Sequence, residues 1–211
     1  MNSREKYHDS EKRAIVTGAS QGIGEGIVNG FRARGYSVVA TSRSIEPLAD
    51  PDLVTVTGDI GDQETGKHLV AAALDRFGRI DTLVNNAGVF IGKPFIEYSE
   101  EDYRLKLRTN LDGFFFTTQQ LIPVMLKQGS GHVVQITAST AEFASSRSPA
   151  FVAMLTKGGM NSATKSMAIE YATRGIRVNA VAPGVIRTPM HDLQIVEQLA
   201  AFHPMNKLGE I

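Results

Sequence analysis

The 211-residue sequence contains no cysteine and no tryptophan. The absence of cysteine excludes disulfide bonds and thiolate metal sites, and it fits a protein of the reducing cytosol. Lysine plus arginine and aspartate plus glutamate number 22 each, so no excess of either sign marks a surface for nucleic acid or anionic membrane. The five histidines are scattered without the spacing of metal ligands. We therefore expect no metal, no nucleic-acid partner and no membrane partner.

Long hydrophobic runs are also missing. No stretch approaches the roughly 20 apolar residues that cross a bilayer, and the polar opening MNSREKYHDSEKR lacks the apolar segment of a signal peptide. The length and the 42% hydrophobic content suit one α/β domain. We expect residues 1–13 to form a loose tail, residues 14–211 to form a single dinucleotide-binding domain, and the protein to be cytoplasmic.

What is present is an alternation of β-branched runs and helical patterns. Strands are expected at Ala14–Gly18, Ser37–Ser42, Leu53–Asp59, Ile80–Asn85, His132–Ile136 and Arg177–Ala182. Helices are expected from Ile23 to Gly35 and at Gln63–Phe77, Tyr98–Gln128 and Ala150–Arg174. This alternation predicts a Rossmann-like, doubly wound parallel sheet of at least six strands, covered by helices in a three-layer α/β/α fold. Polar and small residues follow the strands, at the edge where such sheets bind ligands.

The segment Thr17–Gly24, TGASQGIG, follows the first strand and opens the first helix. Glycines let the backbone approach a pyrophosphate, and the positive end of the helix stabilises its charge. A simple strand-to-helix turn is the alternative interpretation of this segment. Its spacing is TGxxxGxG rather than the commoner GxGxxG.

Two further motifs occur in order along the chain. Asn85–Gly88 reads NNAG after the fourth strand, and Pro183-Gly184 follows the sixth. With these three motifs the sequence resembles the short-chain dehydrogenase/reductase family from about Ala14 to its last residue. The resemblance implies a nicotinamide dinucleotide cofactor and hydride transfer between the nicotinamide and a carbonyl or alcohol carbon.

The resemblance also implies which positions contact the cofactor. The phosphate turn is matched by Gly18, Gly22 and Gly24, together with Ser20, Gln21 and Ile23, and the adenine pocket is matched by Asp59 and Ile60. The loop beside the ribose is matched by Asn86, Ala87 and Gly88, and the ribose ligand by Lys157. The loop that contacts the nicotinamide carboxamide is matched by Pro183, Gly184, Ile186 and Thr188.

The end of the second strand bears on the choice of cofactor. Family members that use NAD carry a carboxylate there, which accepts from the ribose 2′-OH and repels a 2′-phosphate. This chain has Ser42 and Arg43 at that point. A guanidinium can pair bidentately with a phosphate, which favours NADP over NAD. The alternative is that Arg43 is only a solvated charge at a strand end.

The chain departs from the family at its catalytic signature, YxxxK. Lys157 is present, but Ala153 occupies the tyrosine position, and an alanine cannot transfer a proton. The family also carries a catalytic serine just beyond the fifth strand. Counting along that strand places this serine at Ala138, but Ser139 lies one residue further, and we take Ser139 as the candidate. Asn110 matches the family's helix asparagine, which helps to hold a proton-relay water. The predicted catalytic set is therefore Ser139, Lys157 and Asn110.

Two functions remain open at this point. The first is an NAD(P)-dependent oxidoreductase acting on a small carbonyl or alcohol compound. The second is a cofactor-binding protein without dehydrogenase activity that serves as a sensor, scaffold or oligomer partner; repurposed chemistry such as dehydration is a third idea. The missing phenol favours the second function, whereas Asn110 and Lys157 favour the first.

Two expectations concern surfaces and the chain end. The helices Tyr98–Gln128 and Ala150–Arg174 carry more apolar side chains than one face buries, which predicts a homo-oligomer, a dimer or tetramer. The side chains concerned are Phe114, Phe115, Phe116, Met154 and Met160. The alternative is that the phenylalanines pack beneath the sheet. The segment Pro204–Ile211 resembles the part that in the family leads into one more helix and an edge strand, so we expect these to be missing.

Overall fold

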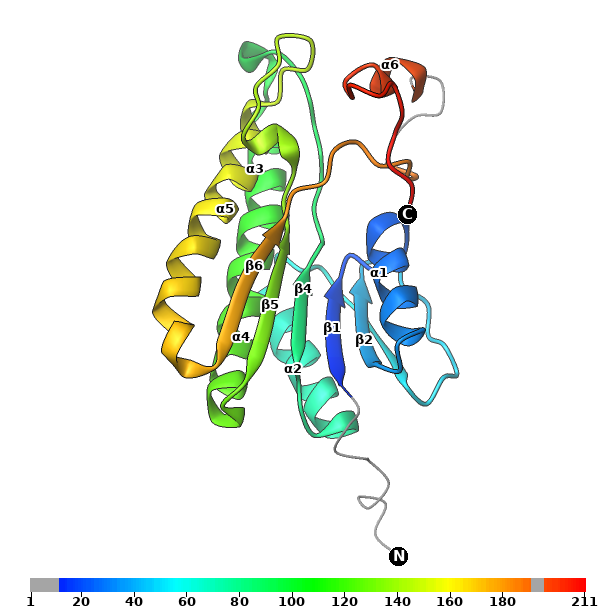
Figure 1. Ribbon diagram of the computed structural model, residues 1–211, viewed down its shortest axis with the longest axis vertical. Helices are drawn as coiled ribbons and strands as arrows, with labels where there is room; N and C mark the ends of the chain where they lie inside the picture. The colour runs from blue at the N-terminus through cyan, green and yellow to red at the C-terminus, as the bar shows by residue number, and fades with distance from the viewer. Residues whose placement is uncertain (1–11, 191–195) are drawn as a thin grey trace, which may run out of the picture.

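The computed structural model describes residues 12–190 and 196–211, and its centre is a sheet of six parallel strands (Figure 1). The strands are β1 (Arg13–Thr17), β2 (Ser37–Ser42), β3 (Leu53–Thr57), β4 (Thr82–Asn85), β5 (Gly131–Ile136) and β6 (Ile176–Val181). Their order across the sheet is β3-β2-β1-β4-β5-β6. This is the doubly wound order, in which the chain reverses direction across the sheet between β1 and β4. The predicted Rossmann-like fold is confirmed.

Helices cover the sheet from two sides. They are α1 (Gly22–Arg32), α2 (Gln63–Phe77), α3 (Glu100–Lys106), α4 (Gly113–Gln128), α5 (Phe151–Tyr171) and α6 (Val196–Ala200), with short 3-10 turns at Phe95–Glu97, Ser139–Ala141 and Ala172–Arg174. In the described part of the chain, no helix is both long and apolar enough to cross a bilayer.

The pleat of the strands divides the apolar core into two layers. Ile15 and Val39 point to the face that α2, α4 and α5 cover, while their neighbours Val16 and Val38 point to the face that α1 covers. Such two-sided burial is the reason why the inner strands consist of continuous apolar runs rather than alternating ones. β1 is buried along its whole length. The first strand and its following turn are thereby fixed at the centre of the molecule.

Several predicted boundaries move by one or two residues. Arg13, the last residue of the predicted tail, is the first residue of β1, and residues 1–11 lie outside the described residues. β4 begins at Thr82 rather than Ile80, because the Ile80 N–H donates to the side chain of Gln128 instead of joining the ladder. β3 ends at Thr57. Gly58 and Asp59 thus belong to the loop at the carboxyl edge.

The predicted long helix over residues 98–128 is interrupted. It begins at Glu100, where Ser99 and Asp102 form a capping box. Between α3 and α4 the backbone follows a π-helix over Leu107–Asp112, a form found mostly as single turns within α-helices and frequently at functional sites. Asn110 lies inside this π segment and is 1% exposed. The irregular turn therefore presents a buried asparagine at the carboxyl edge of the sheet.

The apolar surface expected on the two long helices is only partly present. Met160 is 1% exposed and belongs to the interior, because it lies on the face of α5 that packs inward. Phe115 is 53% exposed, so this ring does not pack beneath the sheet. Phe151 and Leu155 near the start of α5 are also exposed. Because Phe115, Phe151 and Leu155 are exposed, association of copies of the chain through these helices stays a prediction.

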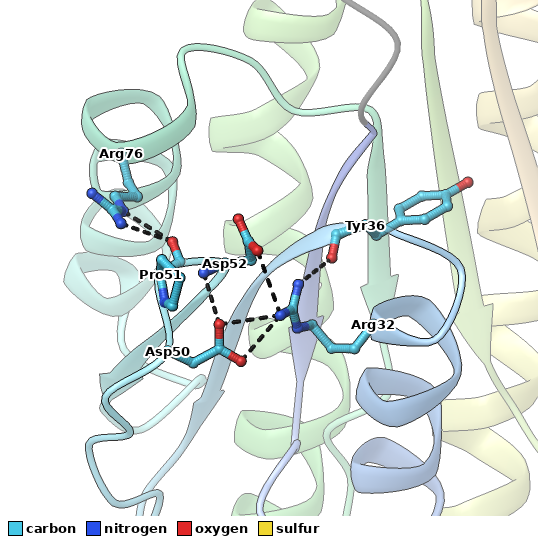
Figure 2. A network of polar contacts seen from close by, with 6 residues as sticks. All are labelled: Arg32, Tyr36, Asp50, Pro51, Asp52 and Arg76. Carbon is cyan, nitrogen blue, oxygen red and sulfur yellow. Dashed lines mark hydrogen bonds and ion pairs between the residues drawn. The ribbon is translucent and has the colours of Figure 1, made fainter. Parts of the chain in front are cut away.

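A polar network fastens the end of α1 to the loop before β3 (Figure 2). The Arg32 guanidinium donates to the backbone carbonyl of Tyr36 at 2.8 Å and to both carboxylate oxygens of Asp50 at 3.1 Å. Asp52 lies 3.6 Å from the same guanidinium. From α2, Arg76 donates to the carbonyl of Pro51 at 2.8 Å. One arginine thus holds the edge of the sheet against its covering helix.

Replacing Arg32 with Met should lower the free energy of unfolding by about 1 kcal/mol, since the network is half-exposed and screened by water. The pKa of Asp50 is lowered by the N–H of Asp52, against a smaller opposing effect of burial, and by Arg32. A lowered pKa stabilises the fold above the ordinary value of 3.8, and this contribution disappears as the pH falls through the folded pKa. Denaturant titrations should therefore show a lower free energy of unfolding for Arg32→Met than for the natural protein at neutral pH, and this difference should shrink in acid.

Arg34→Met is the matched control, because the Arg34 guanidinium is exposed and, from the turn after α1, donates only to the carbonyl of Gly30 in the preceding helix. It should change stability little. An Arg32→Met deficit that stays equally large below the folded pKa of Asp50 would show that the lost contribution is packing rather than charge.

Candidate active site

The glycine turn between β1 and α1 uses backbone conformations that glycine adopts readily. Gly18 and Gly22 have φ angles of +65° and +59°, in the left-handed region that side chains disfavour. A Cβ atom on Gly24 would lie 2.0 Å from the carbonyl oxygen of Gly18. The turn therefore folds tightly onto itself, and no side chain caps the N-terminus of α1 by a hydrogen bond in the described structure. Backbone N–H groups at such a helix start form a ready anion site.

Asn86 fixes this turn from the neighbouring strand. Its side-chain amide donates to the carbonyl oxygens of Thr17 at 2.9 Å and Gly18 at 3.0 Å. In return, the Thr17 hydroxyl accepts from the N–H groups of Asn86 at 3.1 Å and Ala87 at 3.0 Å. The NNAG loop and the glycine turn, which are almost 70 residues apart, thus form one hydrogen-bonded unit.

The loop after β6 closes over the same edge. A Cβ on Gly22 would lie 3.2 Å from the Cβ of Thr188, so the end of this loop touches the glycine turn. At its start, the carbonyl of Pro183 accepts from the N–H of Ser139 at 2.9 Å. Ile186 pairs with Gly209 in an isolated parallel bridge. Of the sequence-predicted residues of this loop, Thr188 therefore lies beside the predicted phosphate turn, whereas Pro183 contacts Ser139 and Gly184 lies against His203.

The other residues that the sequence predicts to contact the cofactor follow the ends of β2 and β3. Arg43 is exposed, and its guanidinium has no hydrogen bond or ion pair within residues 12–190 and 196–211. Ser42 is half-buried and accepts from the N–H of Ser44. Asp59 lies 3.2 Å from the guanidinium of Arg108, and Ile60 is buried against Gly113. Arg43 is thus available to a ligand, whereas Asp59 already has a partner.

Three predicted residues meet at the centre of the edge. A Cβ on Gly88 would lie 3.2 Å from Asn110 Oδ1 and 3.3 Å from Lys157 Nζ. Asn110 accepts from the N–H of Val89 at 3.0 Å and donates to the hydroxyl of Thr156 at 3.1 Å. These bonds tie the π segment to the NNAG loop and to α5. Asn110 and Lys157 both lie against the same glycine, Gly88.

Lys157 is held by the end of β5. Its ammonium donates to the carbonyl oxygen of Ile136 at 2.7 Å. Burial, and secondarily the charge of Lys106, lower the pKa of Lys157 to about 8. Its proton is therefore exchangeable close to neutral pH.

Two positions of the family's catalytic set, those of the tyrosine and the serine, lie on α5 and just after β5. Ala153 is 3% exposed and stands one helical turn before Lys157 on α5. Ser139 opens the 3-10 turn after β5 and is half-buried, and its N–H is bound to the Pro183 carbonyl. Among the described residues, no phenol therefore lies at the expected place next to Lys157.

Sequence reasoning missed Lys106, the last residue of α3. Its side chain is 0% exposed, and its ammonium lies 4.9 Å from the centre of the Phe90 ring, two residues after the NNAG motif. Burial lowers its pKa to about 8, and Asp102 opposes the shift. No feature of the sequence signals this burial, because a lysine on a helix is expected to be exposed.

The edge thus combines a helix start of the kind that suits an anion, an exposed arginine and two lysines with lowered pKa. Within the described residues, no three His, Asp or Glu side chains gather as metal ligands would. Such a set can bind a phosphorylated ligand and exchange protons near neutral pH.

Known proteins of similar sequence carry the names of oxidoreductases or reductases. Oxidoreductase UcpA of Salmonella typhimurium is 40% identical over 208 residues, which covers 95% of this chain and 78% of the relative. The 3-oxoacyl-[acyl-carrier-protein] reductase of Synechocystis is 33% identical and covers 93% of this chain and 83% of the relative.

Solved structures agree in fold over nearly the whole chain. ElxO with NADP bound superposes with a TM-score of 0.87 at 29% identity, covering 94% of this chain and 86% of that one. The 3-ketoacyl-(acyl-carrier-protein) reductase of Brucella melitensis, complexed with NADH, gives a TM-score of 0.86 at 29% identity, covering 94% and 85%.

The family model described as short chain dehydrogenase matches residues 12–197, which include all six strands and every site residue described above. This chain therefore belongs to the short-chain dehydrogenase/reductase family.

Proposed function

We propose that the protein is an NADP-dependent oxidoreductase that moves hydride between the nicotinamide and the carbonyl or alcohol carbon of a small apolar compound. The observation that carries this proposal is the meeting of Gly88, Asn110 and Lys157 beside a tight glycine turn. The relatives named above are oxidoreductases or reductases, and two similar structures hold NADP or NADH. They favour an enzyme over a cofactor-binding protein without activity.

The chain's own residues divide the binding work. In the proposed complex the turn Gly18–Gly24 and the start of α1 hold the pyrophosphate, while Asp59 and Ile60 line the adenine pocket. Residues 86–88 lie along the ribose, and Lys157 binds the nicotinamide ribose. The loop Pro183–Thr188 contacts the carboxamide. The bound cofactor supplies or accepts the hydride.

Proton transfer needs a group other than the family's tyrosine. Ser139, Lys157 and a water held near Asn110 are the proposed polar groups around the substrate oxygen. Lys157 has a pKa of about 8, so it can exchange this proton near neutrality. The substrate is proposed to be apolar, because the rings of Phe95 and Phe151 pack edge to face at 4.8 Å near the start of α5 and remain exposed.

NADPH should bind more tightly than NADH, because Arg43 is free to pair with the 2′-phosphate and no carboxylate opposes it. Arg43→Ala should weaken NADPH about 10-fold or more and leave NADH unchanged, as expected for a lost hydrogen bond to a charged group. Calorimetric titration of both cofactors measures this, with Arg34→Ala as the control for loss of a nearby surface charge. Equal affinities in the natural protein would show that Arg43 is only a solvated side chain.

Installing the missing phenol should accelerate turnover. Ala153→Tyr restores a general acid one helical turn from Lys157, and such a group typically contributes about 10²–10⁴-fold. The measurement is the rate of NADPH consumption with a panel of ketones and aldehydes. Ala153→Phe is the matched control, since it adds the same ring without the hydroxyl.

The outcome also tests the proposed function. A fast natural protein with a dead Ala153→Tyr variant would mean that Ala153 makes room for substrate. If the natural protein reduces no carbonyl compound and Ala153→Tyr gains activity, the natural protein is a cofactor binder.

Association through α4 and α5 should place Phe115 in a contact between copies of the chain. Phe115→Asp should shift the protein toward monomer, because a charge in an apolar contact is not compensated. Sedimentation velocity at micromolar concentration measures the change, with exposed Leu48→Asp in the loop before β3 as the control. A natural protein that sediments as a monomer would contradict the expected homo-oligomer.

A further inference from the structure

The return segment, residues 196–211, contacts parts of the molecule that are far from it in the sequence. Figure 1 shows it in orange-red and red, ending beside α1. Ile211 packs on Gly26 of α1 so closely that a Cβ atom at this glycine would collide with it. From the loop before α5, the Arg147 guanidinium lies 5.2 Å from the centre of the Phe202 ring. The return segment is therefore joined to both halves of the sheet.

The return segment also pairs with the carboxamide loop, residues Pro183–Thr188. The N–H of Gly209 donates to the carbonyl of Val185 at 3.0 Å, and its carbonyl accepts from the N–H of Arg187 at 2.8 Å. The Arg187 side chain donates to the carboxylate of Glu210 at 3.1 Å. The two backbone bonds hold the loop without depending on any particular side chain.

His203 makes the one side-chain hydrogen bond to the backbone of the carboxamide loop that the described residues contain. Its Nε2 accepts from the N–H of Val185 at 3.0 Å. The ring also lies against Gly184, where a Cβ atom would collide with its Cε1. A glycine at position 184 is therefore needed for the imidazole to reach Val185.

The carboxamide loop connects two parts of the proposed site. At its start, the Pro183 carbonyl accepts from the N–H of Ser139 at 2.9 Å, and at its end Thr188 lies against Gly22 of the glycine turn. Between these ends, the hydrogen bonds that hold the loop within the described structure all come from the return segment. Of these, the bond from Val185 depends on a side chain that can lose its acceptor by gaining a proton.

That bond requires a neutral imidazole. Nε2 accepts a hydrogen bond only when it carries no proton, because a protonated imidazole is a donor at both nitrogens. Protonation of His203 would place an N–H donor against the N–H of Val185. Histidine is the side chain that ordinarily changes its charge between about pH 5 and 8. The hold on the loop should therefore be present in neutral solution and be lost as the pH falls.

The charged groups of the surrounding elements do not replace this bond. Among the side chains that the structure describes, His203 has no ion pair. Arg187 of the carboxamide loop is bound to Glu210, and Lys207 of the return segment is exposed. From the loop before α5, Arg147 lies over a ring of the return segment. No described carboxylate is thus paired with the imidazole to hold it in its charged form.

We propose that neutral His203 is a positioning residue, which holds the carboxamide loop against the nicotinamide half of the cofactor, and that its protonation releases this loop. The inference rests on the proposed binding of a nicotinamide dinucleotide. His203 contacts neither the reacting atoms nor the substrate in this role. It acts through Val185, whose N–H it binds.

The test compares two ligands that differ only in the nicotinamide. They are NADP⁺, which is stable in acid, and 2′-phospho-ADP-ribose, which is the same molecule without its nicotinamide. His203→Leu removes the acceptor and should weaken NADP⁺ about 3- to 10-fold, as expected for one hydrogen bond. The Kd of 2′-phospho-ADP-ribose should not change. His203→Gln keeps an acceptor oxygen and should restore most of the affinity for NADP⁺.

The pH dependence separates this role from a purely structural one. Between about pH 8 and about pH 5, NADP⁺ should lose about 3- to 10-fold in affinity relative to 2′-phospho-ADP-ribose in the natural protein. The ratio of the two Kd values should stay constant in His203→Gln, because an amide does not titrate. His68→Gln, at an exposed histidine of α2, is the matched control and should keep the natural pH dependence.

Hydrogen exchange tests the hold on the loop without any cofactor. The backbone N–H groups of residues 183–188 should exchange faster in His203→Leu than in the natural protein at neutral pH, because the loop opens more often. His203→Gln should exchange at nearly the natural rate. Mass spectrometry of the peptides that contain these residues measures the difference.

The contrary outcomes are distinct. Equal exchange in His203→Leu and in the natural protein would show that His203 does not hold the loop, while the proposed function stands. Faster exchange with an unchanged Kd of NADP⁺, or equal weakening of both ligands, would overturn the positioning role in the same way. If the natural protein binds neither NADP⁺ nor NAD⁺, the proposed function is wrong, and the role of His203 toward the cofactor fails with it.

Discussion

The site depends on the hydrogen bonds between the Asn86 side chain and the backbone of Thr17 and Gly18. β1 and β4 are adjacent strands at the point where the sheet reverses its order, and Asn86 follows β4 directly. Its amide satisfies carbonyl groups that would otherwise be left without partners in the tight turn. The same bonds hold the glycine turn and the NNAG loop in one rigid unit. Gly88, Asn110 and Lys157 converge on the free end of that unit.

The electrostatics of the site follow mainly from burial, which lowers the pKa of both lysines near it. Lys157 donates to a backbone carbonyl, and Lys106 is enclosed without a hydrogen bond in the described structure. Two neighbouring cations with pKa values of about 8 are unfavourable for folding, but they are suited to proton exchange. Strained electrostatics of this kind are typical of functional sites rather than of scaffolds. The chemistry-bearing groups of this chain are thus concentrated where the fold leaves its carboxyl edge open.

The sequence predicted the architecture well, because the alternation of apolar strands and amphipathic helices depends on burial alone. It also predicted which residues gather at the edge, since carboxyl ends of parallel strands meet there. It did not predict the π segment, because the side chains of Leu107–Asp112 fit an ordinary helix and the extra residue is accommodated by packing against α5. It took Met160 for surface, although one face of α5 turns it inward. Lys106 was missed because lysine is expected to be exposed on a helix, and only the tertiary packing shows it enclosed.

The most direct test of hydride transfer is isotopic. NADPH deuterated at C4 of the nicotinamide would be incubated with the protein and a pool of apolar ketones and aldehydes, and the products analysed by mass spectrometry. We predict that at least one alcohol product carries deuterium on its carbinol carbon. Tight binding of NADPH with no deuterium in any product would contradict the assignment of this protein as an oxidoreductase.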